Sequence, residues 1–234
     1  MKKKIIISVV VVLSVLMFAY LNDYYRYDPS FDDQCTSNFK LNQEIIDDHY
    51  IYSTNESDIG IIFYPGGKVE KEAYIPLMKH LANHNIHCVL VDMPFHLAIF
   101  DINAADMILK QFPNIDKWYM AGHSLGGSMA SKYIVDHQDE FSGLILLAAY
   151  SCDDLSDSSL DVLSIYGSED QVLNRDKYQK YYSNLPSDTI EHVINGGNHA
   201  YFGNYGNQDK DGIATISVHQ QIIETVDVIV DFVK

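Results

Sequence analysis

From about Tyr50 to the C-terminus, short runs of β-branched residues alternate with stretches in which apolar residues recur every three or four positions. The first pattern is typical of buried strands and the second of amphipathic helices, so their alternation predicts an α/β fold with a mostly parallel sheet covered by helices on both faces. The expected strands are 50–53, 59–64, 88–92, 118–122, 144–149, 162–166 and 190–194, and the expected helices are 70–83, 102–111, 125–136, 176–184 and 213–233.

The last of these helices carries acidic residues on one side only. Glu224, Asp227 and Asp231 recur at intervals of three and four, which places them on one face opposite an apolar face. This pattern indicates an amphipathic helix docked on the domain.

The N-terminal residues follow a different pattern. Residues 5–21 contain no charge and come directly after the lysines at positions 2–4; at ~1.5 Å per helical residue they would span roughly 26 Å. The stretch predicts an uncleaved membrane anchor that contacts the lipid bilayer through residues 5–21, with the lysines inside the cell and the rest of the chain outside. Secretion after signal cleavage is the alternative, but Met17 is large for the position two residues before the candidate cleavage site at Ala19.

A polar segment follows the apolar stretch. Residues 23–49 are rich in Asp and Tyr and have no clear period, so they are expected to form a stalk or tether. The predicted organisation is therefore an anchor over 1–22, a stalk over 23–49 and one catalytic domain over 50–234.

Composition narrows the possible partners. The 234 residues include 32 acidic and 16 basic side chains, giving a net charge of −16, and such a surface is a poor partner for nucleic acid because phosphate binding relies on Lys and Arg. The three cysteines, Cys35, Cys88 and Cys152, have neither C-x-x-C nor zinc-finger spacing. The chain also lacks a GxGxxG fingerprint and a P-loop, so no cofactor is expected.

The strongest chemical signal is a candidate nucleophile. The expected strand 118–122 runs into Gly122-His123-Ser124-Leu125-Gly126, and an expected helix follows at once. This is the strand-turn-helix setting that a G-x-S-x-G nucleophile elbow requires. The glycines are expected because a side chain at either position would collide with the neighbouring strand or helix, while the turn exposes the hydroxyl of Ser124 at the helix N-terminus.

This elbow is one of five segments in which the chain resembles the α/β-hydrolase superfamily, specifically its small, compact serine-hydrolase branch, which is carboxylesterase-like. The resemblance covers residues 50–234 and implies an α/β-hydrolase fold without a cap domain. It does not reach the anchor or the stalk. The segments are FYPGGKVEKEAYIPLMKHLA, VLVDMPFHLAIF, AGHSLGGSMAS, VLSIYGSEDQVL and NGGNHAYFGNYG.

The resemblance implies the chain order serine, acid, histidine for the catalytic groups. His199 follows the last expected strand and is the predicted general base. The resemblance places the acid three residues after Gly167, at Asp170, with Glu169 and the pair Asp153 and Asp154 as alternatives. A cluster of His80, His84 and His87 suggests a metal site at first sight, but its spacing is more typical of a solvated helix face.

The tetrahedral intermediate of acyl transfer needs two backbone N–H donors. Leu125, the residue after the nucleophile, supplies one. Pro65-Gly66-Gly67 stands where many relatives have His-Gly, which puts the second donor on Gly67, with Lys68 as the alternative.

Together these residues predict a serine hydrolase that cleaves an ester-type bond, or a thioester or amide, through an acyl-enzyme. An acyltransferase with the same triad and a catalytically silent, membrane-anchored binding protein are the alternatives. The connection 150–161 is too short and polar for a lid. We therefore expect an open pocket shaped by residues 95–100 and 201–205, and a preference for short or surface-displayed acyl groups.

Overall fold

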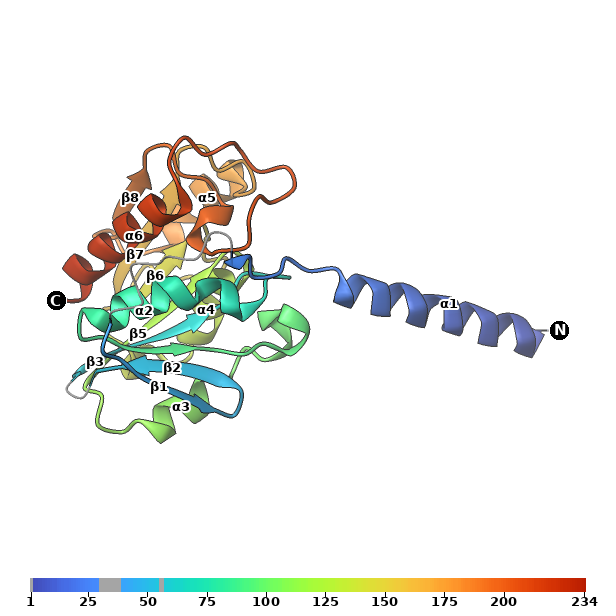
Figure 1. Cartoon of the computed structure of the whole chain (residues 1–234), viewed down its shortest axis with the longest axis horizontal. Helices are drawn as coiled ribbons and strands as arrows, with labels where there is room; N and C mark the ends of the chain where they lie inside the picture. Colours follow the sequence, from blue (N-terminus) through green and yellow to red (C-terminus); the bar gives the residue numbers. More distant parts are fainter. Residues whose placement is uncertain (1, 30–38, 55–56) are drawn as a thin grey trace.

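A computed structural model describes residues 2–29, 39–54 and 57–234, so Cys35 lies outside the described residues. Its centre is an eight-stranded sheet in the order β1-β2-β4-β3-β5-β6-β7-β8 (Figure 1). Strands β3 to β8 are parallel to one another. Strand β2 is antiparallel to both of its neighbours, β1 and β4. The strands are β1 Asn42–Ile46, β2 His49–Ser53, β3 Ile59–Tyr64, β4 His87–Leu90, β5 Lys117–His123, β6 Gly143–Leu147, β7 Asp161–Gly167 and β8 Ile190–Ile194.

The mostly parallel sheet is confirmed, and each of the seven expected strands is present with ends shifted by no more than two residues. The α-helices are α1 Lys2–Asn22, α2 Ile75–Asn83, α3 Ala105–Gln111, α4 Leu125–Ile134, α5 Arg175–Tyr181 and α6 Val218–Val233. The 3-10 helices are η3 Lys71–Tyr74, η4 Pro94–His96, η5 Ala98–Phe100, η6 Gln138–Glu140, η7 Tyr182–Asn184 and η8 Ala200–Phe202.

Helices cover both faces of the sheet, as the alternating pattern predicts. Helices α2 and α6 pack on one face, where Leu81 and Ile222 belong to a shared apolar core. Helices α3 and α4 pack on the other face, where Ile108 and Ile134 contribute to a second core. Because the parallel strands all end at one edge of the sheet, the loops that follow β3, β5, β7 and β8 meet there.

The last helix begins later than the sequence predicts, at Val218 instead of 213. Ser217 caps it: its hydroxyl accepts from the Gln220 N–H, and the Gln220 side chain accepts from the Ser217 N–H. This capping box supplies partners for amides that the helix cannot satisfy internally, so it sets the start of the helix.

Part of the segment expected to form a stalk joins the sheet instead. Residues 42–46 form the edge strand β1, which pairs with β2 through a two-residue turn at Asp47 and Asp48. Both aspartates have positive φ, 49° and 65°, the conformation of the tight turns that match the twist of a hairpin. Most side chains of β1 are exposed, so the strand lacks the apolar alternation that would have identified it.

Another part of the expected stalk lies against the domain. The Tyr25 N–H donates to the Lys68 carbonyl (2.7 Å), and the Glu70 N–H donates to the Tyr25 carbonyl (2.9 Å). The Tyr25 hydroxyl accepts from the Asp209 N–H (3.1 Å). Residues near Tyr25 therefore connect the loop after β3 with the loop after β8.

Helix α1 projects away from the domain (Figure 1). Its large apolar side chains from Ile6 to Tyr20 are 52–69% exposed. In the part of the chain that the structure describes, no helix has both the length and the apolar character needed to cross a membrane. The predicted membrane-spanning anchor is thus not supported: the uncharged stretch of 17 residues is at the short limit of what a bilayer requires.

Candidate active site

Ser124 stands at the sharp turn between β5 and α4. Its backbone has φ 51° and ψ −118°, a strained conformation for a residue with a side chain. The Ser124 N–H donates to the Leu147 carbonyl at the end of β6 (2.9 Å), which helps to hold the turn in place. The strand-turn-helix context expected of a nucleophile elbow is therefore present.

Close packing explains the glycines on either side of this serine. A Cβ atom at Gly126 would lie 2.2 Å from the carbonyl oxygens of Tyr64 and Pro65, and one at Gly122 would lie 2.6 Å from the Gly126 carbonyl carbon. Real Cβ atoms do not approach backbone atoms this closely, so only glycine allows α4 to pack directly against β3 and β5.

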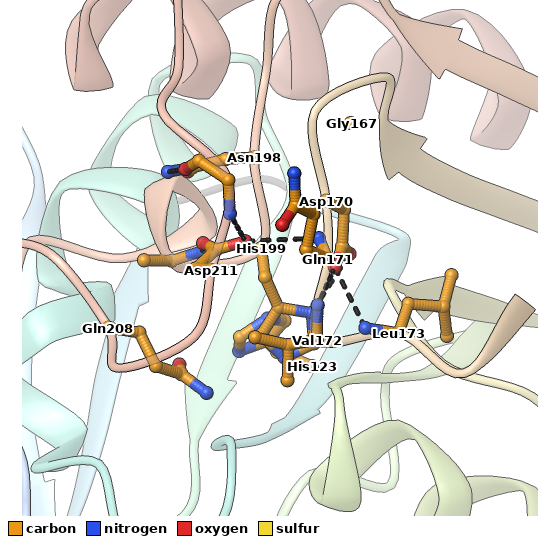
Figure 2. Close-up of polar contacts among 12 residues, drawn as sticks. His123, Gly167, Asp170, Gln171, Val172, Leu173, Asn198, His199, Gln208 and Asp211 are labelled. Atoms are coloured by element: carbon orange, nitrogen blue, oxygen red, sulfur yellow. Dashed lines mark hydrogen bonds and ion pairs between the residues drawn. The ribbon is translucent and has the colours of Figure 1, made fainter.

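Asp170 and His199 form a buried pair at the same edge of the sheet. The His199 Nδ1 atom lies 2.9 Å from Oδ2 of Asp170, and both side chains are almost fully buried. The other carboxylate oxygen of Asp170 accepts from the N–H groups of Val172 (2.9 Å) and Leu173 (2.8 Å), as Figure 2 shows. These bonds hold the carboxylate so that it can fix the orientation of the imidazole.

The alternative acids have other partners. The Glu169 carboxylate accepts from the Ser168 hydroxyl, Asp153 lies 3.8 Å from the Lys132 ammonium group, and Asp154 accepts from the Ser156 N–H. Asp170 is the acid that contacts His199.

The loop after β3 lies against the elbow, and two of its amides have hydrogen-bond partners. The Gly66 N–H donates to the Tyr74 hydroxyl (3.0 Å) and the Lys68 N–H donates to the His96 carbonyl (2.7 Å). A Cβ atom on Gly67 would lie 2.7 Å from the Leu125 side chain, so Gly67 is the neighbour of the residue that follows the nucleophile. Among the described residues no hydrogen-bond acceptor engages the Gly67 N–H or the Leu125 N–H.

Two side chains that the sequence patterns did not identify brace the acid and the base. Asp211 accepts from the Ala200 N–H (2.9 Å), next to His199, and from the Gln171 N–H (3.3 Å), next to Asp170. On α6, the buried Gln221 pairs with both backbone groups of Asn198, its Oε1 accepting from the N–H (3.0 Å) and its Nε2 donating to the carbonyl (2.8 Å). Neither residue belongs to a recognisable motif, because the contacts join residues 11, 23 and 40 positions apart and follow no fixed spacing.

A cavity of about 240 Å³ opens beside the elbow. Ser124 and His199 both line it, and the rest of the wall comes from α4 and the loops after β6 and β7. The fully described connection between β6 and β7 contains no helix. The remaining lining residues are Leu125, Ser128, Ala148, Ala149, Tyr150, Val172, Leu173 and Asn174.

The segments 95–100 and 201–205 do not line this cavity, contrary to the prediction. The first segment lies beside the loop after β3, where the His96 carbonyl accepts a hydrogen bond from the Lys68 N–H. Within the second, Phe202 and Tyr205 are buried in the core. Their hydrophobic side chains are thus used for packing or lie on another part of the surface.

The three histidines near α2 lie on different elements. His80 and His84 belong to the end of α2, whereas His87 is buried in β4 with its ring 4.4 Å from that of Phe112. In residues 2–29, 39–54 and 57–234, no group of three or more His, Cys, Asp or Glu side chains is arranged to hold a metal ion.

Comparisons with known proteins agree with this architecture. A solved structure described as a predicted CIB-like hydrolase from Thermoplasma acidophilum superposes with a TM-score of 0.57, covering 82% of this chain and 99% of that chain at 15% sequence identity. At this identity the similarity shows the fold alone. A search of curated proteins finds no match. The family model of the alpha/beta hydrolase family matches residues 60–223, and because this match spans more than half of the chain, the chain belongs to the alpha/beta hydrolase family.

Proposed function

We propose that this protein is a serine hydrolase that cleaves ester-type acyl bonds, including thioesters or amides, through an acyl-enzyme. The observation that carries the proposal is the shared cavity of Ser124 and His199, with His199 paired through Nδ1 to the buried carboxylate of Asp170. Family membership supports hydrolysis as the broad activity.

In the proposed mechanism, Ser124 Oγ attacks the acyl carbon while His199 Nε2 accepts the hydroxyl proton. Asp170 stabilises the imidazolium that forms. The N–H groups of Gly67 and Leu125 donate to the oxyanion of the tetrahedral intermediate. The imidazolium then protonates the leaving group as its bond to the acyl carbon breaks. A water molecule, deprotonated by His199, releases the acid and regenerates Ser124.

The dimensions of the cavity support small acyl groups as substrates. A volume of about 240 Å³ is below the usual ~300–1,000 Å³ of small-molecule pockets, and no lid helix adds an apolar cover between β6 and β7. A short acyl group, or one displayed on a larger molecule that remains outside the cavity, fits this site better than a long free chain.

The proposal also locates the domain on the outer side of the cell membrane, with residues 5–21 in contact with the bilayer. The lysines at positions 2–4 favour an N-terminus that stays inside the cell, and the exposed apolar side chains of α1 favour contact with lipid.

Labelling with a fluorophosphonate probe tests the proposed nucleophile. The wild-type protein should be labelled, whereas Ser124→Ala should not be. Equal labelling of both would contradict the assignment, and a folded wild type that is never labelled would favour a binding protein. Product analysis with added alcohols distinguishes hydrolysis from acyl transfer.

A further inference from the structure

We propose that Tyr74 and His123 form a buried pair that positions the oxyanion turn, defined as residues 65–69. The inference rests on the proposed function, because it concerns how the Gly67 N–H is directed at the reacting oxygen. Neither side chain lines the cavity, so both are positioning residues and not catalytic ones.

The directions of the hydrogen bonds follow from the groups involved. The Gly66 amide can only donate, so the Tyr74 oxygen accepts its hydrogen bond (3.0 Å). The phenolic hydrogen is then free to donate to Nδ1 of His123, which lies 2.8 Å from the Tyr74 oxygen. In this arrangement His123 is neutral and carries its hydrogen on Nε2, an atom that is buried without a hydrogen-bond partner among the described residues.

Burial keeps this arrangement in one protonation state. Tyr74 and His123 are both 0% exposed. Desolvation raises the pKa of the Tyr74 phenol above its ordinary value, and it lowers the pKa of His123 well below its ordinary value, with a further lowering from nearby His199. Both groups are consequently neutral around pH 7, as the two hydrogen bonds require.

The pair constrains the turn from the side of the elbow. His123 directly precedes Ser124 on β5, and Tyr74 ends η3, which follows the turn. The space between them admits no side chain, since a Cβ atom on Gly66 would lie 2.7 Å from the Tyr74 oxygen and 2.8 Å from His123 Nδ1. The two hydrogen bonds that link Gly66, Tyr74 and His123 thus fix the distance between the turn and Ser124.

The outer side of the turn is held independently. There, the Lys68 N–H donates to the His96 carbonyl (2.7 Å), and Lys68 has a positive φ of 60°. Because the amides on either side of Gly67 are both engaged, the Gly67 amide is the one that the turn leaves for the oxyanion. Loss of the Tyr74 bond would release the Gly66 amide and let the part of the turn beside the elbow shift, while the Lys68 amide stays bound to His96.

The first test is Tyr74→Phe, which keeps the ring and removes only the hydroxyl. We expect kcat to fall by roughly 10- to 100-fold with KM within about twofold of wild type, because the loss affects the transition state. The affinity for a trifluoromethyl ketone, whose adduct with Ser124 carries an oxyanion, should fall by the same factor as kcat/KM. Tyr133→Phe is the matched control: it removes a buried tyrosine's hydrogen bond to Asp106 (2.7 Å) away from the cavity and should leave all three quantities unchanged.

The second test changes the other member of the pair with two side chains of similar shape. His123→Asn keeps an acceptor close to the position of Nδ1, whereas His123→Leu has none. We expect the Asn variant to retain kcat within a few-fold, the Leu variant to lose as much as Tyr74→Phe, and the double variant Tyr74→Phe with His123→Leu to lose no more than either single change.

Several results would overturn the proposal: a folded Tyr74→Phe with wild-type kcat, a fall in kcat without loss of affinity for the ketone, or equal activity of His123→Asn and His123→Leu. If Tyr74→Phe does not fold, the difference in kcat between His123→Asn and His123→Leu tests the proposal. A wild type that neither hydrolyses esters nor reacts with the probe would refute the proposed function itself, and this inference with it.

Discussion

The carboxylate of Asp170 lies 2.9 Å from Nδ1 of His199, although the two residues are separated by 29 positions and follow different strands. Each belongs to a loop at the carboxyl edge of the sheet, one after β7 and one after β8. The pairing of β7 with β8 places Asp170 next to His199.

Replacement of Asp170 by asparagine should therefore lower kcat by roughly 10³- to 10⁴-fold without unfolding the protein, because an amide cannot stabilise the imidazolium and favours the wrong tautomer. Steady-state ester hydrolysis measures the effect. Asp153→Asn, Asp154→Asn and Glu169→Gln are the controls and should retain near wild-type kcat. Loss of activity in one of the controls, together with an active Asp170→Asn, would show that the acid has been misassigned.

The small cavity leads to a prediction about acyl-chain length. The value of kcat/KM should be highest for acetyl or butyryl esters and should decrease for octanoyl and palmitoyl esters, because a cavity of about 240 Å³ cannot enclose a long chain. Measurements with one common leaving group isolate the effect of the acyl group. A steep rise toward palmitoyl, or a lag phase at a lipid interface, would contradict the lidless, short-acyl interpretation.

His87 should make folding stability depend on pH. Burial lowers its pKa from 6.5 to about 4, so below pH 6.5 the unfolded chain binds a proton that the folded chain does not. The free energy of unfolding should fall as pH decreases from 6.5 to 4, by at most about 1.4 kcal/mol per pH unit for this one group. Buried His123 contributes in the same direction.

His87→Phe isolates the first of these contributions. Nε2 of His87 is buried without a hydrogen-bond partner among the described residues, so an apolar ring should be tolerated at pH 7. Urea unfolding at pH 7 and pH 5 should show a smaller loss of stability in the variant than in the wild type. Identical losses would mean that His87 is protonated in the folded protein.

Membrane association through α1 is a separate prediction. The full chain should sediment with the membrane fraction, because exposed apolar side chains on α1 favour contact with lipid. Protease added to intact cells should reach the domain, because the lysines at positions 2–4 favour an N-terminus that stays inside the cell. A variant lacking residues 2–22 is the control and should be recovered in the supernatant. A mature protein whose N-terminus lies near Tyr20 would instead identify the segment as a cleaved signal peptide.

Local patterns in the sequence were sufficient to predict the central strands and the elbow around Ser124. Buried parallel strands are continuous apolar runs. The two glycines of the five-residue motif 122–126 indicate a turn that is too crowded for other side chains. The positions of Asp170 and His199 were predictable from the resemblance to the family, which implies the order of the groups and their places after β7 and β8.

Tertiary contacts decided the edge strand β1 and the residues that support the site. Strand β1 exposes most of its side chains and owes its conformation to pairing with β2, so no local period marks it. Asp211, Gln221 and Tyr74 bind backbone groups that lie 11, 23 and 8 residues away, respectively. A hydrogen bond to a backbone group depends on where that group lies in space and imposes no spacing on the sequence, which is why only the tertiary structure reveals these residues.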